Sequence, residues 1–231
     1  MNTALKEKLV NGYTHKLHIP QVFSEEEMLN RSSEFYNFMD KRRTVREFSD
    51  KPVPKEIIEN IIKTASTAPS GAHKQPWTFV AISNPEMKKK MREAAENVEE
   101  ENYDNRMSER WKEDLAPLGT DDNKAHIEDA PWIIVAFRRS FEFNEDGSKH
   151  NNYYVNESVG LACGFLISAI HNAGLVTLTH TPSPMKFLEK LLNRGENEKA
   201  FILFPVGYAK DPVYVPDLER KKLEEVAVFY E

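Results

Sequence analysis

The stretch from Val155 to Ala173 constrains the fold more than any other part of this chain. Apolar side chains cover nearly every side of the helix that it would form, and Asn172 and Gly174 can close that helix with a C-terminal cap. Because a helix that is apolar all round needs partners all round, we expect it at the centre of the monomer, in a large dimer interface, or in both. Its apolar residues are Val159, Leu161, Ala162, Phe165, Leu166, Ile167 and Ile170.

Length and composition indicate one soluble globular domain spanning residues 1–231. The chain has 231 residues, of which 40% are hydrophobic and 29% are charged, enough to build one sizeable core. Its formal net charge of -6 argues against a surface that coats nucleic acid. We therefore expect any anion to be bound locally, by a few placed cations.

The sequence predicts neither a membrane span nor a disulfide. The longest strongly apolar run, residues 160–170, is too short to cross a bilayer. The N-terminus has early charged residues and no apolar signal core, so we expect a cytoplasmic protein without a membrane anchor. The single cysteine, Cys163, is either a catalytic thiol paired with a histidine or, as its apolar neighbours favour, a buried and inert side chain.

Hydrophobic periodicity and turn residues predict the remaining elements. A capping box at Ser24 and Glu27 opens one helix, and Asn84-Pro85 opens a long charged one. Residues 141–152 are expected to form a polar segment outside the core. The apolar end of the C-terminal tail, residues 226–230, is expected to add a strand to a sheet edge, on this chain or on a second subunit. Other expected helices cover residues 57–68 and 186–192, and expected strands cover residues 77–82, 132–137, 175–181 and 201–206.

Three arginines and a threonine gather between residues 42 and 46. An extended backbone would put Arg42, Thr44 and Arg46 on one side and Arg43 on the other. A guanidinium is a permanently charged fork of donors that fits a phosphate, and the hydroxyl adds a further donor. The cluster is either a solvated basic turn or a site that wraps a single phosphate.

Two further segments suggest ligand binding. The turn around Gly71 is either an ordinary loop or a place where a flat ligand approaches a backbone with free N–H groups. The charged segment of residues 96–124 has few apolar residues, so we expect it to be a lid that is loosely held until a ligand covers it. The sequence offers no paired metal-ligand spacing, no Walker phosphate loop, no G-x-G-x-x-G and no G-x-S-x-G elbow.

The order of these motifs resembles the nitroreductase-like flavoproteins, over nearly the whole chain from Phe23 onward. The resemblance implies an α+β fold, a nitroreductase-like α-β-α sandwich with a mostly antiparallel central sheet, in a domain-swapped homodimer with FMN at the subunit interface. It also implies an N-terminal extension of residues 1–22 and a swapped C-terminal extension of residues 208–231. The residues that carry it are Arg42-Arg43-Thr44-Val45-Arg46, Pro69-Ser70-Gly71-Ala72-His73, Pro76-Trp77, Asn172-Ala173-Gly174-Leu175, Thr179-His180-Thr181-Pro182 and Pro205-Val206-Gly207-Tyr208.

Within that family the chain looks most like the branch that reductively removes halogen from halotyrosines, releasing halide and tyrosine. The resemblance implies that Arg42, Arg43, Thr44, Arg46 and Arg220 grip the FMN phosphate. Further FMN contacts are implied for Pro69, Ser70, Gly71, Thr179 and Thr181, and catalytic roles for Thr181, near flavin N5, and for Ala72, whose backbone N–H meets the phenolic oxygen. Substrate-binding roles are implied for Ala72, Glu99, Tyr103 and Lys124.

Electrons would come from NAD(P)H or from a separate reductase. Glu99 would take the ammonium of an amino acid, Lys124 its carboxylate, and Tyr103 a hydrogen bond at the same end. Two alternatives stay open: a general NAD(P)H-dependent nitro or quinone reductase, and a flavin-binding protein without turnover.

Overall fold

A computed structural model describes residues 6–231 of the chain, which divides into two compact units, Met1–Lys41 and Arg42–Glu231. Within the first unit, strands β1 (Glu7–Val10) and β2 (Tyr13–Lys16) form an antiparallel hairpin that the sequence analysis did not predict. Its turn residues Asn11 and Gly12 both have positive φ, as a tight hairpin turn requires. The helix α1 (Glu25–Asp40) begins as predicted at Ser24, whose hydroxyl accepts the Glu27 N–H at 3.2 Å.

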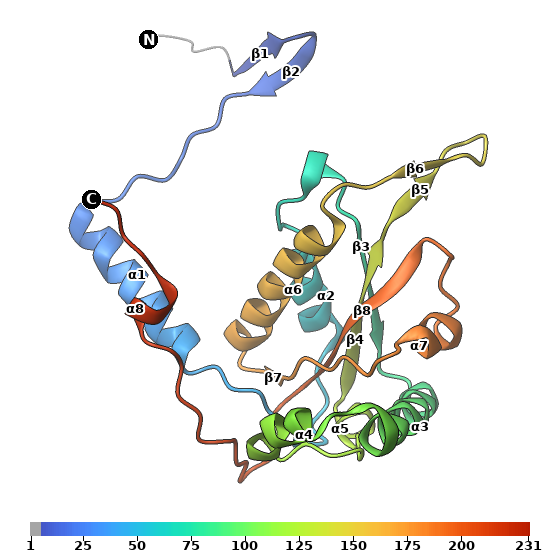
Figure 1. Ribbon diagram of the computed structural model, residues 1–231. Coiled ribbons are helices and arrows are strands. Elements are labelled where there is room, and N and C mark those ends of the chain that lie inside the picture. Colours follow the sequence, from blue (N-terminus) through green and yellow to red (C-terminus); the bar gives the residue numbers. More distant parts are fainter. Residues whose placement is uncertain (1–5) are drawn as a thin grey trace. The chain divides into compact units, whose positions relative to one another are not determined.

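The second unit is built on a four-stranded sheet in the order β3-β4-β8-β7, with every pair antiparallel (Figure 1). Long strands pair in the middle and the shortest lies at one edge. The expected strands at residues 77–82, 132–137 and 201–206 are confirmed, two of them with a longer extent. The bounds are β3 Trp77–Ile82, β4 Trp132–Arg139, β7 Val176–Thr177 and β8 Glu198–Gly207.

Both faces of this sheet are buried, which follows from the side-chain alternation along β4. Ile134 and Ala136 join a core cluster with residues of α2 and α6, whereas Ile133, Val135 and Phe137 join a second cluster with residues of α3, α5 and α7. Two helical layers therefore enclose one antiparallel sheet, which confirms the predicted α-β-α sandwich. The helices are α2 Lys55–Ala65, α3 Pro85–Glu101, α4 Glu109–Leu115, α5 His126–Asp129, α6 Val155–Asn172, α7 Lys186–Leu191 and α8 Leu223–Val226, with single turns at Gly71–His73, Asn102–Arg106 and Ala116–Leu118.

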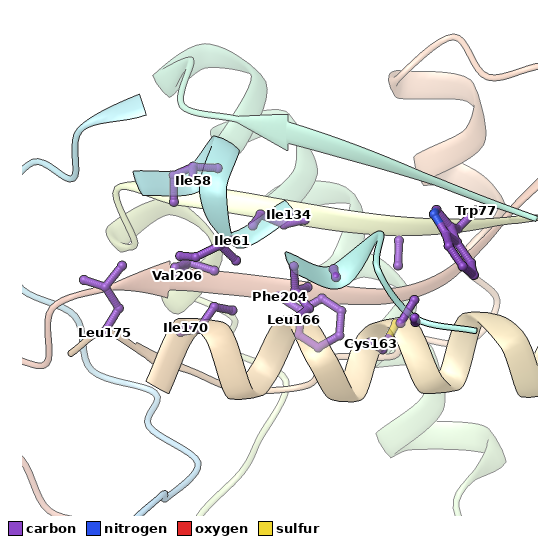
Figure 2. Packing of buried hydrophobic residues seen from close by; sticks show 14 of the residues in the cluster. Ile58, Ile61, Trp77, Ile134, Cys163, Leu166, Ile170, Leu175, Phe204 and Val206 are labelled. Carbon is purple, nitrogen blue, oxygen red and sulfur yellow. The ribbon is translucent and has the colours of Figure 1, made fainter. Parts of the chain in front are cut away.

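Helix α6 packs lengthwise on the sheet, with Cys163, Leu166 and Ile170 directed at Phe204 and its neighbours (Figure 2). Gly174 ends the helix with a φ of 72°, as the predicted cap requires. The opposite side is not buried in this chain, since Leu161 is 49% and Phe165 is 40% exposed. The helix is thus central to the monomer, and its role in a dimer interface remains a prediction.

Several boundaries differ from the sequence prediction. Helix α2 already ends at Ala65, and the third strand shortens to Val176–Thr177 because the following residues leave the sheet, apart from a bridge between His180 and Leu203. The polar segment of residues 141–152 contains a second hairpin, β5 (Phe141–Phe143) with β6 (Lys149–Asn151), around a turn in which Gly147 has a φ of 82°.

The tail from Tyr208 forms no strand within the described chain. Its start pairs with residues 47–49 through backbone hydrogen bonds, and the helix α8 is its one regular element. Val228, Phe229 and Tyr230 at its end stay exposed. Across residues 6–231, no helix is long and apolar enough to cross a membrane.

Candidate functional site

One cavity of about 530 Å³ collects most of the residues that the sequence singles out. Four segments of the second unit line it: the arginine stretch at 42–46, residues 99–126, the chain at 178–181 that follows β7, and the tail at 215–220. Ten predicted site residues lie on its wall: Arg42, Arg43, Thr44, Arg46, Glu99, Tyr103, Lys124, Thr179, Thr181 and Arg220.

The arginine stretch is extended because its backbone is tied to β7. Val45 is buried and donates its N–H to the Thr177 carbonyl at 3.2 Å, and Thr44 forms a parallel bridge with the same residue. The alternation expected from the sequence follows, with Arg42, Thr44 and Arg46 partly buried and Arg43 exposed. The guanidinium groups of Arg42, Arg43 and Arg46 therefore line one end of the cavity.

Three of these cations, Arg42, Arg43 and Arg220, lie near one another. Arg220 reaches from the tail and donates to the Arg42 carbonyl at 2.9 Å, and Arg43 donates to the same oxygen at 3.1 Å. Burial and the neighbouring charges of Arg220 and Arg43 lower the pKa of Arg42, and burial lowers that of Arg46. A phosphate dianion would relieve this repulsion and match the donor set, so the residues present fit the phosphate end of a cofactor.

The other end of the cavity holds an ion pair. Glu99, near the end of α3, places Oε2 3.7 Å from Nζ of Lys124, and these residues are only 8% and 4% exposed. The backbone N–H of Lys124 donates to Glu96 at 2.9 Å, and its ammonium also donates to the Asp121 carbonyl. Helix α3 itself is anchored by Met91 and Ala95, which are fully buried.

Burial and the neighbouring charges act in opposite directions on both members of the pair. Burial alone would raise the pKa of Glu99, but His180 and Lys124 outweigh it and the net pKa lies below the usual carboxyl value. Burial lowers the pKa of Lys124, against the opposing effect of Glu99. An acid and a base of opposite charge on one wall complement the ammonium and carboxylate of an amino acid.

Tyr103 and an apolar wall lie beside this pair. The Tyr103 hydroxyl donates to the Thr120 carbonyl at 3.0 Å, its ring is 5.7 Å from Lys124 Nζ, and burial raises its pKa. Asn102 donates to the Ser183 carbonyl at 2.9 Å and so ties this segment to the chain after β7. The apolar lining residues of the segment are Met107, Trp111, Leu115 and Leu118.

Two histidines that the sequence analysis gave no role lie between the two ends. His126 Nε2 and His180 Nδ1 are 3.0 Å apart, both residues are 7% exposed, and both line the cavity. Thr179 and Thr181, on either side of His180, are exposed. The alternation of this extended segment was visible in the sequence, but the pairing with His126 was not, because 54 residues separate the two.

The turn that contains Pro69, Ser70, Gly71 and Ala72 does not line this cavity. Gly71 lacks positive φ, so the special backbone angles expected there are wrong. An added Cβ would lie 3.0 Å from the Tyr153 carbonyl, so this chain's own backbone already requires a glycine, and an approach of a flat ligand stays a prediction.

Ala72, not Gly71, has the unusual backbone. Its φ is 49°, and His73 and Gln75 are also left-handed, which costs free energy for residues with a Cβ and is typical of functional sites. Ala72 is exposed, and its N–H has no hydrogen-bond partner among the described residues. A donor open to a ligand, as predicted at this turn, is therefore present.

Metal and thiol chemistry find little support in the described part of the chain. Residues 6–231 contain no group of three or more histidine, cysteine, aspartate or glutamate side chains that could hold a metal ion. Cys163 is buried on α6, and burial raises the pKa of its thiol to about 12. This confirms the buried position that its apolar neighbours favoured, and a thiol with a raised pKa forms little of the reactive thiolate.

Comparisons with known proteins give the family of the chain. Residues 39–208 match the nitroreductase family. The chain is 60% identical over 208 residues to an iodotyrosine deiodinase from Haliscomenobacter hydrossis, covering 90% of this chain and 94% of that one. It is 48% identical to an iodotyrosine deiodinase from Hydra vulgaris, covering 92% and 78% of the two chains.

A solved structure of oxidized iodotyrosine deiodinase bound to FMN and 3-iodo-L-tyrosine matches the fold with a TM-score of 0.75. The identity is 31%, and the match covers 85% of this chain and 98% of the other. Such identities over most of both chains go well beyond a shared fold. The chain therefore belongs to the nitroreductase family and, within it, to the iodotyrosine deiodinases.

Proposed function

We propose that this protein is an FMN-dependent oxidoreductase that removes halogen from halotyrosines by reduction, releasing halide and tyrosine. The observation that carries the proposal is a single cavity with clustered guanidinium groups at one end and the buried Glu99–Lys124 pair at the other. The first end fits a phosphate, and the second fits a zwitterion. The similarity to iodotyrosine deiodinases supports this assignment.

The cation end is assigned to the cofactor phosphate. Arg42, Thr44 and Arg46 would donate from the extended stretch, with Arg43 and Arg220 completing the set. Thr179 and Thr181, exposed on the cavity wall, are assigned to the flavin, and Thr181 is the hydroxyl that we place near N5. When bound, FMN supplies two electrons which, with one proton, convert the carbon–halogen bond into a carbon–hydrogen bond and a halide ion.

The acidic and basic end is assigned to the substrate. In the free protein Glu99 and Lys124 neutralise each other, and a zwitterion would replace that pair with two new ones, ammonium on Glu99 and carboxylate on Lys124. Tyr103 lies beside both and offers a hydroxyl to the same end. The segment of residues 96–124 would serve as the lid, with its apolar wall covering the ring and excluding water.

We further propose that the active form is a homodimer in which residues 208–231 are exchanged. The exposed Leu161 and Phe165 on α6 and the exposed apolar end of the tail support it, since such surface is normally covered by a partner. The turn of Pro69, Ser70, Gly71 and Ala72, which does not line the cavity of its own chain, would then contribute FMN contacts and the Ala72 N–H donor to a shared site.

The proposed function is tested by loading the protein with FMN, reducing it with dithionite and measuring iodide released from 3-iodo-L-tyrosine. We expect stoichiometric iodide and tyrosine, with much slower release from 2-iodophenol, which lacks the amino-acid end. Protein that stays colourless after incubation with FMN contradicts the cofactor assignment. Protein that binds FMN but favours nitro compounds or quinones with NAD(P)H, and releases no iodide, supports the general reductase instead.

A further inference from the structure

The buried histidine pair beside the substrate end has a feature that the proposed function does not use. His180 Nε2 is buried and has no hydrogen-bond partner among the described residues. It is directed at Glu99, whose Oε1 lies 3.7 Å away, while the other carboxylate oxygen lies 3.7 Å from Lys124. A buried nitrogen without a partner costs free energy, so its retention within reach of a functional carboxylate calls for an explanation.

The nearby carboxylate favours one tautomer for both rings. An ionised carboxylate only accepts hydrogen bonds, so a proton on the His180 nitrogen that faces Glu99 is the favourable arrangement. In a neutral imidazole the other nitrogen, Nδ1, is then an acceptor, and at 3.0 Å it receives the N–H of His126 Nε2. The result is a directed chain from His126 through His180 to Glu99.

Burial, together with the cations around the pair, favours the neutral form of both rings. Lys124, Arg46 and Arg92 face it from the cavity wall and α3, and Glu99 is the one anion among these groups. Burial, followed by His180 and these cations, lowers the pKa of His126 to about 3, and burial also lowers the pKa of His180. Neutral rings can support the Glu99 carboxylate without adding a cation that would compete with a substrate ammonium.

We propose that His180 and His126 are positioning residues that hold Glu99 for the ammonium of the substrate, an inference that rests on the proposed function and deepens it. His180 Nε2–H engages Oε1, which leaves Oε2 to exchange Lys124 for the incoming ammonium. His126 acts one step further away, because its N–H holds His180 in the tautomer that donates to Glu99. The pair thereby raises the preference of the site for zwitterions over plain phenols.

The first test reads the tautomers directly. Long-range ¹H–¹⁵N spectra of the imidazoles, recorded on the FMN-loaded protein at neutral pH, should give protonated Nε2 and bare Nδ1 for both His126 and His180. Adding 3-iodo-L-tyrosine should shift the His180 Nε2–H resonance downfield as Nε2 and Glu99 Oε1 move from 3.7 Å into hydrogen-bond distance. A protonated Nδ1 on His180, or a spectrum that the ligand leaves unchanged, overturns the proposal even if every variant fails to fold.

The second test uses matched variants. His126→Gln keeps an N–H near the position of Nε2, whereas His126→Phe keeps the ring volume and removes the donor; His180→Gln and His180→Leu form a second pair. Titrations of the FMN-loaded proteins with 3-iodo-L-tyrosine and with 2-iodophenol, followed by flavin fluorescence, give a preference ratio. We expect the Phe and Leu variants to lower that ratio by about three- to tenfold, because Glu99 loses its orienting donor.

The glutamine variants should retain most of the preference, a rescue that a merely space-filling role would not give. Equal ratios for the glutamine, phenylalanine and leucine variants overturn the proposal. An unmodified protein that binds both ligands equally would contradict the zwitterion assignment itself, and the tautomer spectrum then decides on the histidine chain separately. The two failures are therefore distinguishable.

Discussion

The two ends of the cavity differ in how their charged side chains are arranged. At the phosphate end the groups that most affect Arg42, apart from burial, are two further cations. At the substrate end each charge has a partner, with Glu99 between Lys124 and His180 and the histidines uncharged. The first end brings like charges together, whereas the second pairs opposite charges.

This difference predicts how tightly each end holds its ligand. An anion at the arginines relieves repulsion as well as forming new bonds, so the cofactor should stay bound through purification. A zwitterion at the other end only exchanges one set of ion pairs for another, which leaves a small net free energy and allows substrate and product to leave. Tight binding at the arginine end suits a cofactor that stays bound, and weaker binding at the other end suits a substrate that is exchanged in every turnover.

Removing the cations should have the largest effect. Replacing Arg42 and Arg46 together by Ala deletes two charge-assisted contacts, each worth about 1.5–3 kcal/mol, so we expect protein that purifies without flavin. Absorbance near 450 nm and a titration with added FMN measure this.

Arg110→Ala is the control, since Arg110 is a surface arginine paired with Asp114 at 3.4 Å and should keep its flavin. Unchanged flavin content in the double variant would place the phosphate elsewhere.

Acid should destabilise the folded protein through the buried His126 at the substrate end. His126 has a pKa of about 3 when folded and about 6.5 when unfolded, so between these values only the unfolded chain binds the proton. The free energy of unfolding therefore falls as the pH falls through this range, by up to about 1.4 kcal/mol per pH unit from His126. Urea unfolding of the apoprotein at pH 7, 6 and 5 measures the slope.

His126→Gln removes this titrating group and should flatten the slope by about one proton. Equal slopes for His126→Gln and the unmodified protein would mean that His126 is already protonated in the folded protein.

The sequence predicts the regular layers well because their signals are local. Short runs rich in apolar residues specify β3, β4 and β8, and the apolar faces of α2 and α6 specify where those helices pack. The strand β7 was predicted too long, because Leu178 to Thr181 has the composition of a strand but ends in Pro182 and bridges to β8 only at His180. Here tertiary pairing, not propensity, decides the extent.

The candidate site was predictable where resemblance supplied the pattern and not where two distant residues meet. Arg42 and Arg46 stand out as a cluster, but the burial of Glu99 in a run of glutamates does not, since a charge run normally forms a solvated face. His126 and His180 give no signal singly. Their contact depends on how α5 lies against the chain after β7, which no local rule specifies.

Glu99→Gln tests the neutralised end directly. The substitution removes the negative partner of the ammonium and nearly preserves the shape, so binding of 3-iodo-L-tyrosine should weaken by roughly 1–3 kcal/mol, while that of 2-iodophenol changes little. Quenching of flavin fluorescence gives both constants. Glu100→Gln is the matched control one residue along the helix, where the side chain is exposed. A loss of the same size in both variants would point to net charge rather than to a placed carboxylate.

The smallest expected effect is at Thr181, which lies between the two ends of the cavity. Thr181→Ala removes one exposed hydroxyl and neither a charge nor a core contact, so both FMN and 3-iodo-L-tyrosine should bind as before. If Thr181 donates near flavin N5, iodide release should slow by about tenfold, the cost of one neutral hydrogen bond, and nitro reduction should slow less. Thr179→Ala is the comparison, because Thr179 is exposed on the same segment two residues earlier. A larger loss of the iodide-release rate in Thr179→Ala than in Thr181→Ala would assign the N5 contact to Thr179. The flavin ring would then lie nearer to Thr179 than to Thr181.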